Sequence, residues 1–198
     1  KVPKRIEIDA GDGDDSVHVE RINADVEIDG GGGNDRLQYV GEGNARIEGG
    51  DGDDLIFGSK GKDILDGGAG HDTLHGGAGD DSLLGGEGND MVFGDQGDDS
   101  LAGGDGNDTL RAGMGRDVLD GDEGKDMIRG GCGADKLNGG DDDDMLRGGH
   151  GKDEVSGGDG DDNLRGGRGR DDLHGDQGKD KVYLRRADTI NHDAEDVI

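Results

Sequence analysis

The sequence has few of the side chains from which an ordinary hydrophobic core is built. Of its 198 residues, 2% are aromatic, 27% are apolar and none is tryptophan. Its 50 acidic and 22 basic residues leave a formal net charge of −28, a composition typical of disordered chains. The 47 glycines are costly to order. Hydrophobic burial therefore cannot supply the whole driving force for folding.

Other absences exclude further classes of protein. Cys132 is the single cysteine, so the chain cannot contain an internal disulfide framework. No run approaches the roughly 18 apolar residues of a membrane span, and no apolar leader precedes the first repeats, so we expect no membrane insertion. A strongly acidic surface would also repel nucleic acid. The expected partner is a cation, and metal binding is expected to supply folding energy.

The chain is built on a short repeat. From Gly49 to Tyr183 it consists of fifteen consecutive nonapeptides, Gly-Gly-x-Gly-x-Asp-x-aliphatic-x, without insertion or deletion. Position six is Asp and position eight is aliphatic in all fifteen copies. Position one is Gly except at Ala112, position four is Gly except at Asp142, and position two is replaced at Ser59, Asp95, Asp122 and Asp176. Such regularity indicates one structural unit stacked many times.

Each nonapeptide predicts a turn over its first six residues and a short strand over its last three. Glycine permits positive φ and close backbone approach, while strand alternation points position eight inward and positions seven and nine outward. Two repeats would form one coil, and successive coils would stack about 4.8 Å apart. The predicted fold is all-β: a right-handed parallel β-roll, or β-solenoid, with two nonapeptides per coil and a thin aliphatic interior.

The repeats divide the chain into three predicted parts. Residues 1–48 form N-terminal β-roll coils with degenerate repeats, and residues 49–183 form the regular roll. Residues 184–198, with aliphatic segments at 188–190 and 195–198, are interpreted as a C-terminal cap over the last coil.

The degenerate coils lack part of the repeat. Ala24 and Ala45 stand where Asp is expected, while Val26 and Ile47 keep the inward aliphatic position. We therefore expect these coils to bind cation on one side only.

Copies such as residues 67–75, Gly-Gly-Ala-Gly-His-Asp-Thr-Leu-His, resemble the hemolysin-type RTX calcium-binding nonapeptide repeat family, and the resemblance covers at least residues 49–183. It implies a parallel β-roll in which each Ca²⁺ lies between two turns one coil apart, held by position-six carboxylates and turn carbonyls. The implied carboxylate ligands are Asp15, Asp35, Asp54, Asp63, Asp72, Asp81, Asp90, Asp99, Asp108, Asp117, Asp126, Asp135, Asp144, Asp153, Asp162, Asp171 and Asp180. The implied carbonyl ligands include Gly50, Gly52, Gly68, Gly70, Gly77, Gly79, Gly86, Gly88, Gly104 and Gly106.

The ligand chemistry favours the same metal independently. Hard oxygen ligands in a flexible, glycine-rich backbone suit Ca²⁺ better than the strict octahedron of Mg²⁺. Zinc would require Cys or His, and the six histidines form no ligand-spaced pair. The turns form two columns with up to nine and six gaps, so up to about fifteen Ca²⁺ would bring about +30 against the formal −28. Folding should therefore be cooperative and calcium-dependent.

The sequence contains no recognisable catalytic constellation, so no catalytic residue is predicted and the chain is not expected to be an enzyme. The first interpretation is a calcium-binding module of a secreted or cell-surface bacterial protein, such as a toxin, adhesin, S-layer protein or exoenzyme. The resemblance implies that the parent protein leaves the cell unfolded through a type I secretion machinery and folds outside on binding calcium.

One outward stripe is not explained by calcium. Position nine of one predicted sheet carries an arginine ladder, Arg111, Arg129, Arg147 and Arg165. The ladder could be screened by the acidic rims, with its stems covering the sheet. Alternatively it could bind a polyanionic glycan, an acidic polysaccharide whose carboxylates meet the guanidiniums. A third possibility is self-association through Phe57, Met91 and Phe93.

Overall fold

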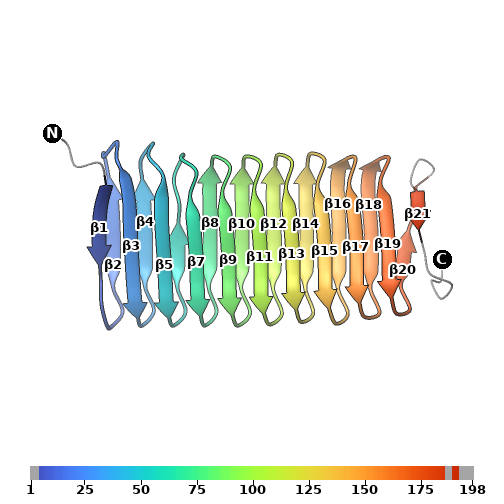
Figure 1. Cartoon of the computed structure of the whole chain (residues 1–198), viewed down its shortest axis with the longest axis horizontal. Helices are drawn as coiled ribbons and strands as arrows, with labels where there is room; N and C mark the ends of the chain where they lie inside the picture. Colours follow the sequence, from blue (N-terminus) through green and yellow to red (C-terminus); the bar gives the residue numbers. More distant parts are fainter. Residues whose placement is uncertain (1–4, 186–188, 192–198) are drawn as a thin grey trace.

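The chain winds into a solenoid with two facing parallel sheets (Figure 1). The computed structural model describes residues 5–185 and 189–191, and in these residues all 21 regular elements are β-strands. Odd-numbered strands form an 11-stranded sheet, called sheet A, and even-numbered strands form a 10-stranded sheet, called sheet B. The predicted all-β, parallel β-solenoid with two nonapeptides per coil is confirmed.

The strands of the two sheets alternate along the chain. Sheet A contains β1 (Arg5–Asp9), β3 (Asp25–Gly32), β5 (Ala45–Asp51), β7 (Ile64–Ala69), β9 (Ser82–Glu87), β11 (Ser100–Asp105), β13 (Val118–Glu123), β15 (Lys136–Asp141), β17 (Glu154–Asp159), β19 (Asp172–Gln177) and β21 (Thr189–Asn191). Sheet B contains β2 (Ser16–Glu20), β4 (Arg36–Val40), β6 (Leu55–Phe57), β8 (Thr73–Ala78), β10 (Met91–Gln96), β12 (Thr109–Met114), β14 (Met127–Cys132), β16 (Met145–Gly151), β18 (Asn163–Gly169) and β20 (Lys181–Tyr183).

Most strands of the regular roll are longer than predicted. Strand β8 has six residues and includes positions one to three of the following repeat, so the turn proper is limited to positions four to six. The inter-coil bonds continue through this part, where the Ala78 N–H donates to the Ser59 carbonyl at 2.9 Å. The prediction of a six-residue turn was therefore wrong. Because the glycine pair carries no side chains, neighbouring backbones approach closely enough to extend the parallel ladder.

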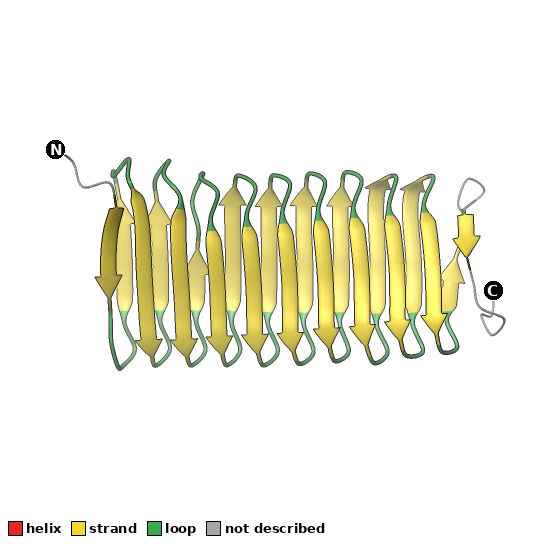
Figure 2. Cartoon of the chain, viewed as in Figure 1, coloured by secondary structure: helices red, strands yellow, loops and turns green. Residues whose placement is uncertain are grey.

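The spacing between stacked residues changes along the chain. The N–H of Asp15 donates to Asp35, 20 residues later, while Asp35 donates to Asp54, 19 residues later. From Asp54 onward the separation is 18 residues, as between Asp54 and Asp72. The degenerate coils are thus slightly longer, and the extra residues lie in the larger loops at the N-terminal end of one rim (Figure 2).

The interior is one aliphatic layer. All fifteen position-eight side chains are buried, with Val182 the most exposed at 5%. In the degenerate coils Ile47 is fully buried, which confirms its inward position eight. Val26 is also buried, but it pairs with Ala45 while Ile28 pairs with Ile47. The prediction that Val26 occupies position eight and Ala24 the Asp position was therefore wrong, because the longer degenerate coil shifts the register by two residues. Each buried aliphatic side chain contributes about 1.5–3 kcal/mol, so the interior stabilises the stack but is thin.

The described C-terminal residues continue the solenoid. Strand β21 pairs with β19 in parallel, placing Ile190 opposite Leu173. The other predicted aliphatic segment, Glu195 to Ile198, lies outside the described residues. Among the described residues there is no helix long and apolar enough to cross a membrane.

Candidate metal centres

The position-six aspartates form two columns, one along each rim of the roll. Column one contains the turns that lead from sheet A to sheet B, such as residues 70–72, and column two contains the return turns, such as residues 79–81. Of the seventeen predicted aspartates, sixteen are no more than 3% exposed, and Asp15 is partly buried. Buried carboxylates are rare unless they are paired or bind a metal ion.

One carboxylate oxygen of each buried aspartate holds the stack together. The Oδ1 atom of Asp90 accepts the N–H of Asp72 at 2.8 Å, and the Oδ1 atom of Asp108 accepts the N–H of Asp90 at 2.8 Å. The same bond recurs at every step of both columns. Position six therefore has a structural role that is independent of any metal.

In most of these aspartates the second oxygen, Oδ2, has no such partner. In the part of the chain that the structure describes, fourteen of these atoms are buried without a hydrogen bond: those of Asp15, Asp35, Asp54, Asp72, Asp81, Asp90, Asp99, Asp108, Asp117, Asp126, Asp135, Asp144, Asp153 and Asp162. Native proteins contain only a few unsatisfied buried polar groups per hundred residues. Because the same atom is unsatisfied in turn after turn, these turns present the same free acceptor oxygen to a cation at each step.

Position-one glycines leave an oxygen-lined space beside Oδ2. A Cβ atom added to Gly85 would lie 2.5 Å from Asp90 Oδ2 and 2.5 Å from the carbonyl oxygen of Gly103, one coil later. A Cβ atom on the position-four glycine Gly70 would collide with the carbonyl oxygen of Gly52. Side chains at either position would thus crowd the oxygens that face the gap between coils.

The ten glycines predicted as carbonyl ligands share one backbone conformation, with φ between +106° and +140°. Where the repeat departs from glycine at positions two and four, Asp95, Asp122, Asp142 and Asp176 have φ between 66° and 76°. Aspartate tolerates this left-handed region better than most residues. The conformation of the turn is therefore retained where glycine is replaced by aspartate.

The donor set fits Ca²⁺. Among residues 5–185 and 189–191 no group of three or more His, Cys, Asp or Glu side chains could by itself hold a metal ion. A gap between coils offers two carboxylates, for example those of Asp72 and Asp90, so backbone carbonyls must complete the shell. Calcium accepts this mixture of six to eight oxygen ligands, whereas zinc favours four nitrogen or sulfur ligands.

Burial changes the acidity of the columns. Burial, and to a smaller extent repulsion from Asp108 and Asp144, raises the pKa of Asp126 to about 8. Burial also raises the pKa values of four further members to about 7: Asp72, Asp81, Asp135 and Asp144. Without a cation, protons would therefore occupy part of the columns near neutral pH.

Acidification is expected to restore β structure to the metal-free chain. The folded-state pKa values of about 6 to 8 exceed the ordinary value of 3.8, so the folded state binds more protons than the unfolded state. This contribution to stability is complete below about pH 4 and is lost as the pH rises through about 6 to 8. Circular dichroism in a chelator, recorded from about pH 8 down to about pH 5, measures the gain. A β signal that falls on acidification would contradict it.

Column two begins earlier than the sequence indicated. The turn at residues 41–45 stacks beneath residues 58–63, and the Ala45 N–H donates to Asp63 Oδ1 at 2.6 Å. The Ser59 N–H donates to Asp63 Oδ2 at 2.5 Å, so both oxygens of this carboxylate accept hydrogen bonds. At this end of column two, hydrogen bonds replace the requirement for a cation.

The side chain of Tyr39 lies in the gap between the turns at residues 22–24 and 41–45, a role that the sequence did not lead us to predict. Its side chain is fully buried, and its hydroxyl lies 2.9 Å from the carbonyl oxygens of both Ile22 and Ala24. The Gly43 N–H donates to the same hydroxyl at 3.3 Å. Tyr39 stands at inward position one, where the regular repeat has glycine, and that replacement was the available signal. The phenol thus serves turn carbonyls in a coil that has no position-six carboxylate.

Replacing Tyr39 with Phe is expected to destabilise the N-terminal coils locally by about 1–3 kcal/mol, because buried carbonyls lose their donor. Hydrogen exchange in saturating calcium should show faster exchange in β3, β4 and β5 and unchanged exchange beyond residue 100. Tyr183→Phe is the matched control, since Tyr183 is 46% exposed. Equal exchange in wild type and Tyr39→Phe would exclude this role.

The four ladder arginines lie away from both columns. They are exposed on the outer face of sheet B, where Arg111 pairs in register with Arg129 and Arg147 with Arg165. The predicted stripe is confirmed by the pairing, but it belongs to a separate surface.

Comparison with known families identifies the repeat. A family model of the RTX calcium-binding nonapeptide repeat, four copies long, matches residues 25–38, 39–74, 66–101, 93–128, 120–155, 129–164 and 156–186. The matches extend without a gap from residue 25 to residue 186 and include degenerate coils before residue 49. No curated protein matches the chain.

Proposed function

The chain belongs to the RTX calcium-binding nonapeptide repeat family, and from this membership we propose that it is a module that folds when Ca²⁺ binds between its coils. The observation that carries the proposal is the set of fourteen buried carboxylate oxygens without a hydrogen-bond partner. They recur in the same place in successive turns, as binding sites between stacked units would.

Simple energetics support a requirement for metal. An unsatisfied buried polar group costs about 1–3 kcal/mol, and a charged group costs more. Fourteen such costs exceed the 5–15 kcal/mol by which a folded domain is usually stable. At neutral pH a cation must therefore offset them, and Ca²⁺ supplies two positive charges per gap.

The proposed ligands are the position-six carboxylates on both sides of a gap together with the position-two and position-four carbonyls. Column one offers nine gaps between Asp15 and Asp180, and column two offers six between Asp63 and Asp171. The proposed capacity is up to about fifteen ions. The chain's own residues hold the ions and keep the coils in register, and no catalytic residue or reaction is assigned.

The setting we propose is extracellular: a secreted or cell-surface bacterial protein such as a toxin, adhesin, S-layer protein or exoenzyme. Extracellular calcium modules bind with Kd values of about 10⁻⁴–10⁻³ M, far above those of cytosolic calcium buffers. Inside a cell the charge of −28 would keep the chain expanded, which suits export through a type I secretion machinery. Calcium outside the cell would then trigger folding.

Counting bound ions tests the proposal. Native mass spectrometry of the chain, transferred from solution at about 1 mM calcium, should show a distribution that reaches about fifteen ions. The same measurement in magnesium is the control and should show few bound ions, because Mg²⁺ demands a stricter geometry. Saturation at one or two Ca²⁺ would contradict the proposed columns.

A further inference from the structure

A group of exposed basic side chains on sheet B and its adjoining turns forms no ion pair among the described residues. The basic face consists of the four ladder arginines and four residues toward the column-two rim: Arg111, Arg129, Arg147, Arg165, Arg116, Lys152, Arg168 and Arg170. All eight are exposed. In the part of the chain that the structure describes, none of their side chains forms an ion pair with a carboxylate.

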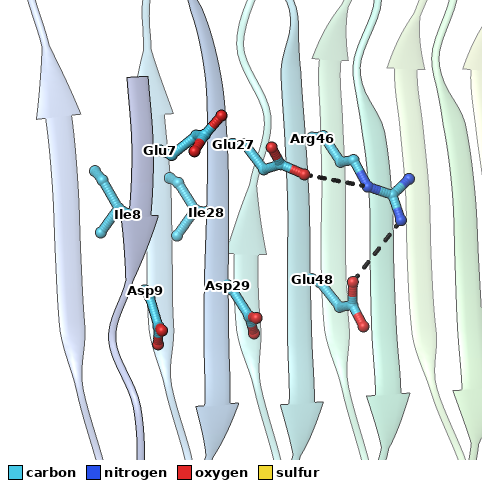
Figure 3. Close-up of a pocket in the computed structure, with 8 residues that line it drawn as sticks. All are labelled: Glu7, Ile8, Asp9, Glu27, Ile28, Asp29, Arg46 and Glu48. Atoms are coloured by element: carbon cyan, nitrogen blue, oxygen red, sulfur yellow. Dashed lines mark ion pairs between the residues drawn. The ribbon is translucent and has the colours of Figure 1, made fainter. Parts of the chain in front are cut away.

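A shortage of acids does not explain this. The chain has 50 acidic residues, and other basic side chains use them. Figure 3 shows Arg46 on sheet A between Glu27 and Glu48, with N···O distances of 3.9 and 3.8 Å. Lys60 forms an ion pair with Glu42 at 3.3 Å. Seven other basic residues of the described part form such ion pairs, so the eight residues of the basic face are the largest group without one.

The ladder is also unfavourable by itself. Parallel pairing places successive guanidinium groups on neighbouring strands, about 4.8 Å apart, where like charges repel. At its ends, Arg111 lies 6.0 Å from the ring of Phe93 and Arg165 lies 4.4 Å from the ring of Tyr183. Among the described residues, the two central arginines, Arg129 and Arg147, have neither a ring contact nor an ion pair.

The surface around the ladder is hollowed along the axis of the roll. One groove of about 310 Å³ is lined by Arg111, Arg129 and Arg147. A second, of about 290 Å³, is lined by Arg147, Arg165 and Tyr183. Because Arg147 borders both, the two grooves lie next to each other along the axis of the roll.

The opposite face repels anions. Position three of sheet A carries consecutive carboxylates, Glu87, Asp105, Glu123, Asp141 and Asp159, in parallel register. Sheet B has no such row, so charge is sorted between the two faces. A polyanion would thus be directed to the basic face alone.

We propose that the basic face binds a linear polycarboxylate polysaccharide that lies along the roll axis, with each guanidinium meeting a carboxylate of the polymer. A regular ladder one side chain wide fits a polymer of repeating charge, whereas a folded partner has irregularly spaced charges. Guanidinium and carboxylate groups form strong charge-assisted hydrogen bonds. Calcium binding, as proposed above, both stacks the ladder arginines in register and neutralises the aspartate columns. Polysaccharide binding therefore requires the folded, calcium-loaded chain.

A galacturonate hexasaccharide, too short to gel with calcium, is the probe, with neutral maltohexaose as the ligand control. In calorimetric titrations at about 1 mM calcium, Arg129→Ser combined with Arg147→Ser should weaken binding about tenfold or more. The slope of log K against log salt should become shallower by about 1 to 2, since two ionic contacts are lost. Arg46→Ser combined with Lys60→Ser changes the net charge equally and should leave both quantities unchanged.

Three results would overturn the proposal. One is no measurable binding of the hexasaccharide by the folded wild type. Another is equal weakening in both double variants, which would indicate only non-specific charge. The third is concentration-dependent self-association that the Arg129→Ser and Arg147→Ser changes abolish, because the face would then be an interface between copies. Circular dichroism of every variant in calcium keeps this test separate from the folding proposal, whose failure would appear as a missing calcium transition.

Discussion

Removal of calcium at neutral pH is expected to abolish the β-sheet signal of this chain. Without the ions, the buried carboxylates of both columns face each other across every gap and cannot all remain ionised. The aliphatic interior is one layer deep, and 47 glycines add to the entropy lost on folding. At ten times its Kd, each bound ion contributes about 1.4 kcal/mol, so several ions together match the net stability of a domain.

The transition should be steep. An interior carboxylate such as that of Asp90 borders two gaps, so an ion that orders one gap also positions a ligand for the next. Far-UV circular dichroism during a calcium titration should show a cooperative gain of β signal with a midpoint near 10⁻⁴–10⁻³ M, roughly that of other extracellular modules. A parallel magnesium titration should produce little change. A full β signal in a chelator at pH 7.5 would show that the solenoid does not depend on metal.

Replacing Asp108 with Ala is expected to be the most damaging single change in the middle of the roll. It removes the acceptor of the Asp90 N–H, which is 2.8 Å from Asp108 Oδ1, and leaves that buried donor unsatisfied. It also takes one carboxylate from each of two neighbouring gaps. We expect a loss of about 3–5 kcal/mol in the free energy of unfolding at saturating calcium, comparable to breaking a buried ion pair.

The control for Asp108→Ala lies in the same repeat. Asp105→Ala changes the net charge equally, but Asp105 is exposed on sheet A and acts on Asp108 only as a nearby charge, so its effect should stay within about 0.5 kcal/mol. Urea unfolding at fixed calcium measures both variants, and hydrogen exchange shows whether the roll opens at the altered coil. Similar losses for the two variants would mean that total charge, and not the column, decides stability.

At Asp63, the position in the repeat predicts one role for the carboxylate and the contacts with neighbouring turns give it another. Its position in the repeat predicts a metal ligand like any other, but its two oxygens accept the N–H groups of Ala45 and Ser59. The replacement of glycine by serine at position two and the missing carboxylate at Ala45 are both visible in the sequence. Their combined effect appears only when the coils are stacked, because the partners come from different turns.

The sequence by itself determined the solenoid, the inward aliphatic layer, the two columns of aspartates and the choice of calcium. The first three follow from a period of nine, since an uninterrupted repeat gives every unit the same backbone and places equivalent residues 18 apart on neighbouring strands. The arginine ladder was predictable for the same reason. Calcium follows from the hard oxygen ligands that the repeat supplies.

Only the tertiary structure decided how the atoms of each site are used. It assigned Oδ1 to the neighbouring N–H and left Oδ2 unsatisfied, extended the strands through the glycine pairs, and placed the Tyr39 hydroxyl among the carbonyls of a degenerate turn. It also showed that the side chains of the basic face form no ion pair among the described residues. These features depend on distances between atoms of different coils, and a linear pattern specifies which residues are stacked but not which of their atoms find a partner.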